Sequence, residues 1–176
     1  MGKRVSQLQE ELADREAIRD CLYRYARGID RLDEDLLRSA YWPEAIDSHL
    51  SFTGTVEELI AWAFPLMRQM DQNIHLIGNI LIELHGLEAE VESYFYGIQR
   101  AAIEGSMRDM IAAGRYLDRF ERRGEEWRIA NRMVMTDWFR EYPDSADWTR
   151  GPFGMGDVPR GALKPDDKSY SWLGWR

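Results

Sequence analysis

The chain has 176 residues, 44% of them hydrophobic and 12% aromatic, which fits one folded domain with an appended segment. Its 23 Lys and Arg residues against 31 Asp and Glu residues give a net charge of -8, and this sign argues against binding to nucleic acid. A single cysteine, Cys21, excludes an internal disulfide and a cysteine-rich zinc cluster. The start of the chain, MGKRVSQLQEELADRE, has no apolar stretch, and no segment has the length and apolarity of a membrane helix. We therefore expect a cytoplasmic protein that contacts no membrane.

The first part of the chain predicts two helices that meet at a corner. Apolar residues between Ser6 and Arg27 recur with helical period and leave charged residues on the other face. Gly28 is a candidate stop for this helix, because glycine tolerates the left-handed backbone found at helix ends. Asp33 can cap a second short helix that runs through Ala40. This arrangement puts Asp30 in or beside the corner.

A short strand and a third helix are predicted next. The strand covers residues 45–50, and the sequence SFTG is expected to turn the chain. Thr55 and Glu58 form a capping-box pattern at the start of the third helix. Pro65 should kink that helix or end its regular part.

Four long strands follow, because the apolar period changes from helical to alternating. These segments are rich in Ile, Val, Tyr, Phe and Trp, and the turn candidates HGLE, EGS and RGEE separate them. They are Asn73–Leu84, Ala89–Ile103, Met107–Arg122 and Glu125–Arg140. We predict an α+β domain over residues 1–142, a cone in which a curved antiparallel sheet wraps around the N-terminal helices and leaves a central hydrophobic cavity.

The remaining segment, residues 143–176, is rich in Gly, Pro, Asp and Trp and has no clear period. Its tryptophans make it too apolar to stay entirely solvated. We expect an extended tail that packs on the cavity mouth or on a neighbouring subunit.

His75 is the first candidate for chemistry. It lies in QNIHLIGNILIEL, where strand alternation places His75, Ile77, Asn79 and Leu81 on one face. A neutral imidazole can take up a proton at neutral pH, so His75 is a candidate general base. The alternative is a buried structural histidine whose nitrogen is satisfied. Asp30, in YRYARGIDRLDED, has its own alternative as a solvated corner or helix-cap residue.

The segments REAIRDCLYRYARGID, YWPEA and NIHLIGN resemble the SnoaL-like branch of the nuclear-transport-factor-like superfamily of cystatin-like cones, over roughly Glu10 to Phe139. The resemblance extends to the scytalone dehydratase, hexachlorocyclohexane dehydrochlorinase and bile-acid 7α-dehydratase enzymes. It implies that His75 acts as the base and that Asp30 orients it, with no metal or cofactor. Such a carboxylate fixes the tautomer of the imidazole and stabilises the imidazolium that forms on proton uptake.

The same resemblance gives roles to two further residues. Tyr25 matches a tyrosine that assists departure of a hydroxyl group or holds a carbonyl oxygen, and its alternative is an aromatic core residue. Arg132 matches an arginine that stabilises a leaving anion, and its alternative is an outward, solvated arginine or an interface ion pair. Asn79, on the predicted face of His75, could orient a substrate oxygen or make a structural hydrogen bond.

Aromatic and methionine side chains are expected to wall the cavity, although such residues are more often simply core. The members that we name as substrate-facing are Trp42, Tyr96 and Tyr116. A wall of this kind suits a flat hydrophobic substrate such as a steroid, a polyketide, a terpenoid or a lignin-derived aromatic compound. The histidines show no zinc-ligand spacing, and no glycine-rich phosphate loop is present, so we expect neither metal nor cofactor.

These patterns predict a cofactor-independent, dehydratase-like lyase that removes a proton next to an activating group and expels a leaving group. Isomerisation would use the same proton abstraction, and a retro-aldol cleavage that releases formaldehyde would use a related deprotonation. Two other classes compete: a noncatalytic small subunit of an aromatic-ring-hydroxylating oxygenase, and a small-molecule-binding protein. The resemblance also implies a homo-oligomer, with a trimer favoured and a dimer possible.

Overall fold

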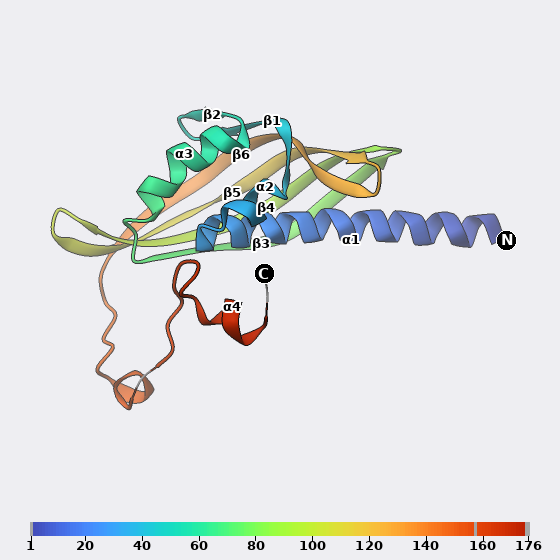
Figure 1. The fold of residues 1–176 in the computed structure, drawn as a ribbon. Helices are drawn as coiled ribbons and strands as arrows, with labels where there is room; N and C mark the ends of the chain where they lie inside the picture. Colours follow the sequence, from blue (N-terminus) through green and yellow to red (C-terminus); the bar gives the residue numbers. More distant parts are fainter. Residues whose placement is uncertain (1, 157, 175–176) are drawn as a thin grey trace.

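A curved sheet of six strands folds around the N-terminal helix in the computed structural model, which describes residues 2–156 and 158–174 (Figure 1). The spatial strand order is β2-β1-β6-β5-β4-β3. The elements are α1 (Gly2–Arg31), α2 (Glu34–Arg38), β1 (Tyr41–His49), β2 (Phe52–Gly54), α3 (Val56–Met67), β3 (Gln72–His85), β4 (Glu88–Ile103), β5 (Ser106–Arg123), β6 (Glu126–Pro143), the 3-10 helix η1 (Gly151–Gly154) and α4 (Lys168–Trp172). The predicted α+β class is confirmed.

The four long predicted strands are confirmed as β3 to β6, which pair in sequence order and antiparallel. The prediction of a wholly antiparallel sheet is wrong at one place, because β1 pairs parallel to β6. The sequence SFTG was expected to be a turn, but Phe52–Gly54 forms β2 and pairs antiparallel with β1. The sheet is therefore mixed.

The predicted stop of the first helix at Gly28 is wrong. Helix α1 continues to Arg31, and the chain turns at Leu32, which has a φ of 52°. The structure gives Gly28 another role, because a Cβ at this position would lie 2.7 Å from the backbone nitrogen of Leu37. A missing side chain thus lets α1 and α2 approach each other closely. The predicted cap at Asp33 is confirmed, since its carboxylate accepts the backbone N–H of Leu36.

Helix α3 begins with the predicted capping box of Thr55 and Glu58. Pro65 lies in its last turn, and the helix ends at Met67, so Pro65 marks the end of the regular part as predicted. Neither α3 nor any other described helix combines the length and apolarity that crossing a bilayer requires.

Helix α1 lies along the concave face of the sheet (Figure 1). Its buried stripe includes Ile18, Leu22 and Tyr25, none of which is exposed to solvent. Polar contacts fix its position: Trp127 Nε1 donates to the Asp14 carboxylate at 2.8 Å, and Arg15 donates to the carbonyl oxygen of Ile82 at 2.7 Å. Burial of each large apolar side chain contributes on the order of 1.5–3 kcal/mol.

A β-bulge at Asn79 divides strand β3 into two halves. Gly78 pairs with Tyr94 and Ile80 pairs with Ser93, so Asn79 has no cross-strand partner, and its φ is 35°. The single extra residue exchanges the faces of all residues that follow. The predicted alternation therefore holds for His75 and Ile77 but fails at Asn79 and Leu81, both of which are exposed.

The chain after β6 leaves the domain, turns at η1 and returns beneath the C-terminal end of α1 (Figure 1). There Asp33 accepts hydrogen bonds from Lys164 Nζ at 2.7 Å and from the Tyr170 hydroxyl at 2.9 Å. Leu163 packs against the core, and Asp167 accepts the backbone N–H of Ala162 at 2.9 Å. The returning part of the tail is thus attached to the α1–α2 corner of its own chain; residues 1, 157, 175 and 176, which include Trp175, lie outside the described part.

Candidate active site

Asp30 and His75 form a hydrogen-bonded pair although 45 positions separate them in sequence. Asp30 Oδ1 lies 2.6 Å from His75 Nδ1, and Asp30 Oδ2 accepts the backbone N–H of the same histidine at 2.9 Å. Each of the two side chains has 10% of its surface exposed. Because the carboxylate accepts a backbone N–H on one oxygen, its other oxygen is also placed as an acceptor, and the proton of a neutral imidazole belongs on Nδ1. This leaves the lone pair on Nε2.

Local structure explains how the pair meets. Asp30 lies in the last turn of α1. His75 is the fourth residue of β3, and its side chain points to the concave face. A β-strand exposes the backbone N–H of alternate residues at its edge, and β3 is an edge of the sheet. Asp30 caps one of these free N–H groups and orients the imidazole of the same residue.

The Nε2 atom of His75 has no hydrogen-bond partner in the described residues. His75 belongs to a row of paired residues that runs across four strands. It pairs with Gly97, Gly97 with Ala112, and Ala112 with Phe139. An added Cβ at Gly97 would lie 3.5 Å from Nε2, so the absence of a side chain keeps space over this atom. Phe139 is 57% exposed, so this end of the row is open to solvent. The row gives the base small and apolar neighbours.

The other two predicted catalytic residues, Tyr25 and Arg132, lie in a separate buried cluster. The Arg132 guanidinium donates from Nε and Nη2 to the two oxygens of Asp118, each at 2.7 Å. Its Nη1 lies 3.4 Å from the hydroxyl of Tyr41, and the rings of Tyr25 and Tyr116 cover it at 4.0 and 4.1 Å. None of the Arg132 surface is exposed. The hydrogen bonds and both faces of the guanidinium are engaged by protein groups. This packing does not favour the predicted contact between Arg132 and a leaving anion.

Burial governs the electrostatics of this cluster. It raises the pKa of Tyr25 to about 12, although the nearby Arg132 opposes the shift. Burial would lower the pKa of Arg132, but the charge of Asp118 outweighs it and holds that pKa well above its ordinary value. Arg132 therefore stays charged, and this part of the interior is filled by an ion pair and aromatic rings in place of the predicted hydrophobic cavity.

The structure places all three predicted wall residues away from the surface around His75. Trp42 lies under the guanidinium groups of Arg123 and Arg128, 4.6 and 4.9 Å from its ring, and its indole N–H donates to the carbonyl oxygen of Glu121. Tyr96 pairs with Leu76 and therefore points to the convex face. There it meets Trp138, with ring centroids 5.7 Å apart.

Asn79, predicted to orient a substrate oxygen, and Tyr116, the third predicted wall residue, also lie elsewhere. Asn79 occupies the bulge and is exposed. Tyr116 is fully buried and stacks on Phe95 with ring centroids 4.6 Å apart. Tyr116 is thus a core residue, which was the alternative weighed for aromatic side chains of this kind.

Two residues near His75 were missed by the sequence reasoning. Asn73 precedes His75 by two positions, is 2% exposed and donates to the carbonyl oxygen of Met67 at 3.3 Å, while its Oδ1 has no partner. Alternation read backwards from His75 could have found Asn73. Gly97 could not have been found without the pairing register, because a glycine in a strand carries no sign of what lies across from it.

Within the part of the chain that the structure describes, one group of side chains could hold a metal ion. Glu83, His85 and Glu90 place their ligand atoms within 4.8 Å of one another, and all three are exposed. The group lies near the β3–β4 hairpin, whereas His75 lies near the other end of β3. Nothing links these three side chains to the Asp30–His75 pair.

A helix-wrapped curved sheet that carries a carboxylate–imidazole pair on its concave side defines the class, a cystatin-like α+β cone. The model of the SnoaL-like domain family matches residues 10–133, and the chain belongs to this family. A sequence comparison with curated proteins gave no match.

Solved structures support the same class. The crystal structure of LinA superimposes with a TM-score of 0.70 at 21% identity, covering 82% of this chain and 98% of that one. A scytalone dehydratase-like protein from Novosphingobium aromaticivorans gives 0.68 at 20% identity, covering 79% and 94%. A type 2 hexachlorocyclohexane dehydrochlorinase gives 0.67 at 20% identity, covering 76% and 92%. At such identities the likeness concerns the fold.

Proposed function

We propose that the protein is a cofactor-independent lyase of the dehydratase kind that acts on a hydrophobic small molecule. The proposal is carried by the two hydrogen bonds between Asp30 and His75, one at Nδ1 and one at the backbone nitrogen. They support a base whose tautomer is fixed and whose free Nε2 faces the open end of the concave surface. The dehydratase and dehydrochlorinase structures with the same fold agree with this class of reaction.

In the proposed reaction, His75 Nε2 takes a proton from a carbon next to a carbonyl or other activating group. The electron pair of the broken C–H bond forms the new double bond, and the C–O bond to the leaving hydroxyl breaks. Asp30 stabilises the imidazolium through its Nδ1–H. The imidazolium then returns its proton to the departing oxygen, so the products are water and an unsaturated compound.

The surroundings of the pair favour an apolar substrate. Gly97 and Ala112 give no polar group, and Phe139 offers an exposed ring on the same cross-strand row. The flat steroid, polyketide, terpenoid or lignin-derived compounds considered above fit such a surface better than sugars do.

The test is turnover of a panel of aromatic β-hydroxyketones, followed by the absorbance of the enone product. We expect His75→Ala to lower kcat/KM by a factor on the order of 10²–10⁴ while circular dichroism stays unchanged. His85→Ala is the matched control, because His85 is exposed and lies outside the pair. A folded His75→Ala variant with full activity would refute the proposed role.

The products distinguish the related reactions. A shifted double bond without water loss would identify an isomerase, and formaldehyde from a β-hydroxyketone with a terminal CH₂OH group would identify a retro-aldol lyase. Saturable binding without any product would identify a small-molecule-binding protein. Copurification with a larger iron-containing chain would identify the oxygenase subunit.

A further inference from the structure

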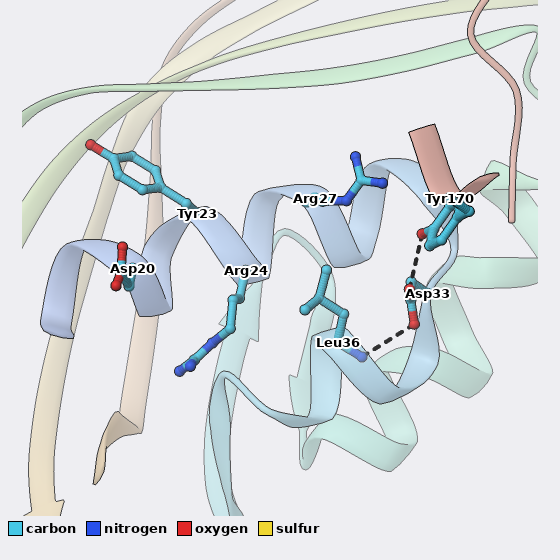
Figure 2. A pocket seen from close by; sticks show the side chains of 7 residues that line it. All are labelled: Asp20, Tyr23, Arg24, Arg27, Asp33, Leu36 and Tyr170. Carbon is cyan, nitrogen blue, oxygen red and sulfur yellow. Dashed lines mark hydrogen bonds between the residues drawn. The ribbon is translucent and has the colours of Figure 1, made fainter. Parts of the chain in front are cut away.

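A second hollow, with a volume of about 520 Å³, lies on the helical side of the domain between α1, α2 and α4 (Figure 2). We call it the helical-side pocket. Its volume falls within the range of small-molecule sites. Neither Asp30 nor His75 lines it. The residues that do are Asp20, Tyr23, Arg24, Arg27, Asp33, Leu36 and Tyr170.

The pocket is formed by one stripe of α1 and by the returning tail. Residues 20, 23, 24 and 27 are spaced three or four apart, so they share the helix face opposite to the buried stripe. Arg27 donates to the Ser169 hydroxyl at 2.8 Å, and its guanidinium lies 4.9 Å from the centre of the Tyr170 ring. The tail therefore supplies one wall of the pocket.

Arg24 brings a positive charge that no carboxylate in the described residues pairs with. Its Nη2 makes a long hydrogen bond of 3.4 Å to the carbonyl oxygen of Ser39, and its Nε is buried without a partner. A guanidinium has five N–H donors, and leaving them without acceptors costs free energy. An anion in the pocket would satisfy this group, because arginine binds carboxylates with paired hydrogen bonds.

The two acidic residues that line the pocket, Asp20 and Asp33, do not fill this need. Asp33 is occupied by Lys164 and Tyr170, as Figure 2 shows for the tyrosine. Burial would raise the pKa of Asp33, but these two hydrogen bonds outweigh it and hold the pKa below its ordinary value. Asp20 lies one turn before Arg24 and is exposed, so it disfavours ligands with more than one negative charge.

We propose that the helical-side pocket binds a small aromatic monocarboxylate. Its carboxylate pairs with Arg24, with Arg27 contributing to the positive field, and its ring packs on Leu36, which lies next to Arg24 (Figure 2). Two guanidinium groups beside apolar side chains select for a single negative charge attached to a hydrophobic body.

The test uses benzoate as the probe and isothermal titration calorimetry on the full chain at low ionic strength. We expect one saturable site, no binding of the neutral isostere benzamide, and a loss of affinity of about tenfold or more in Arg24→Gln. Arg19→Gln is the matched control, because Arg19 is on the same helix, pairs with Glu16 and does not line the pocket. His75→Ala should bind benzoate as the wild type does.

Several results would overturn the proposal. Equal binding of benzamide and benzoate would show that charge plays no part, and this comparison holds even if Arg24→Gln fails to fold. Loss of benzoate binding in His75→Ala, with full binding in Arg24→Gln, would place benzoate at the Asp30–His75 pair. Binding of inorganic phosphate but not of benzoate would show a different ligand class.

Discussion

Asp30 contacts His75 twice, through Oδ1 to the ring nitrogen Nδ1 at 2.6 Å and through Oδ2 to the backbone nitrogen at 2.9 Å. One side chain therefore fixes both the rotation of the imidazole and the position of the strand edge that carries it. The two functions can be separated by mutation.

Asp30→Asn should lower activity without unfolding the domain. The carboxylate of Asp30 uses one oxygen for the backbone N–H of His75 and the other for Nδ1. An asparagine offers an accepting oxygen at only one of these two positions and an NH₂ donor at the other, so the tautomer of His75 is no longer fixed. We expect kcat/KM to fall by roughly a hundredfold or more. Nitrogen NMR of the imidazole should show a larger share of the Nε2–H tautomer, and an unchanged tautomer ratio would contradict this explanation.

Gly97→Val should block the base, whereas Gly97→Ala should be tolerated. A Cβ at this position reaches 3.5 Å from His75 Nε2, which is ordinary contact, but the two further methyl groups of valine would occupy the space next to that atom. We expect strong loss of kcat in Gly97→Val with thermal stability close to the wild type. Equal activity of the two variants would show that Nε2 is not the working atom.

Arg132→Met should destabilise the protein by about 3–5 kcal/mol, because it leaves Asp118 charged and buried without its partner. Urea unfolding measures this free energy. The double variant with Asp118→Leu removes both charges and should be more stable than Arg132→Met alone. Exposed Arg68→Met is the control, with an expected change within about 0.5 kcal/mol.

Attachment of the tail should weaken at acidic pH. Burial would raise the pKa of Asp167, but hydrogen bonds from Ala162 and Ser169 and the charge of Arg31 outweigh it and lower the pKa to about 2. A carboxyl whose pKa is lowered by folding stabilises the attached state above its unfolded pKa of about 3.8, and this contribution is lost as the pH falls toward 2. The pKa of Asp33 is also lowered, so protonation of Asp33 at acidic pH weakens the attachment of the tail in the same way.

Limited proteolysis of the tail between pH 5 and pH 2 measures this loss. Tyr170→Phe removes one of the donors that lower the pKa of Asp33, so its transition should occur at a higher pH than in the wild type. A tail whose cleavage rate is independent of pH across this range would contradict the assignment.

The convex face of the sheet should mediate self-association. It carries exposed apolar side chains on β3, β4 and β6, namely Ile74, Leu76, Leu81, Tyr94, Tyr96, Met133, Met135 and Trp138. Exposed apolar side chains gathered on one face are typical of protein interfaces. Light scattering should show a homo-oligomer that Leu76→Lys dissociates, whereas Leu66→Lys, which changes an equally exposed leucine on α3, should not.

Much of the fold could be predicted from the sequence, because alternation over long strands and the Thr55–Glu58 and Asp33 caps are local signals. The residues of the dyad could be named only with a family resemblance, since nothing local relates Asp30 to His75. The predicted substrate contacts of Asn79 and Tyr96 failed for two physical reasons. The β-bulge at Asn79 changed which residues of β3 face inward, and the pairing of Tyr96 with Leu76 turns Tyr96 to the convex face.

The bulge has a consequence for how this strand can change in length. Its first half presents His75 to the concave side, and its second half presents Ile80, Ile82 and Leu84 to the same side. Deleting Asn79 would restore unbroken alternation and keep both the base and the three aliphatic side chains inward, because Gly78 and Ile80 already pair with consecutive residues of β4. A single deletion at any other position between His75 and Ile80 would instead turn one half of the strand away from the concave face, unless the bulge is lost with it.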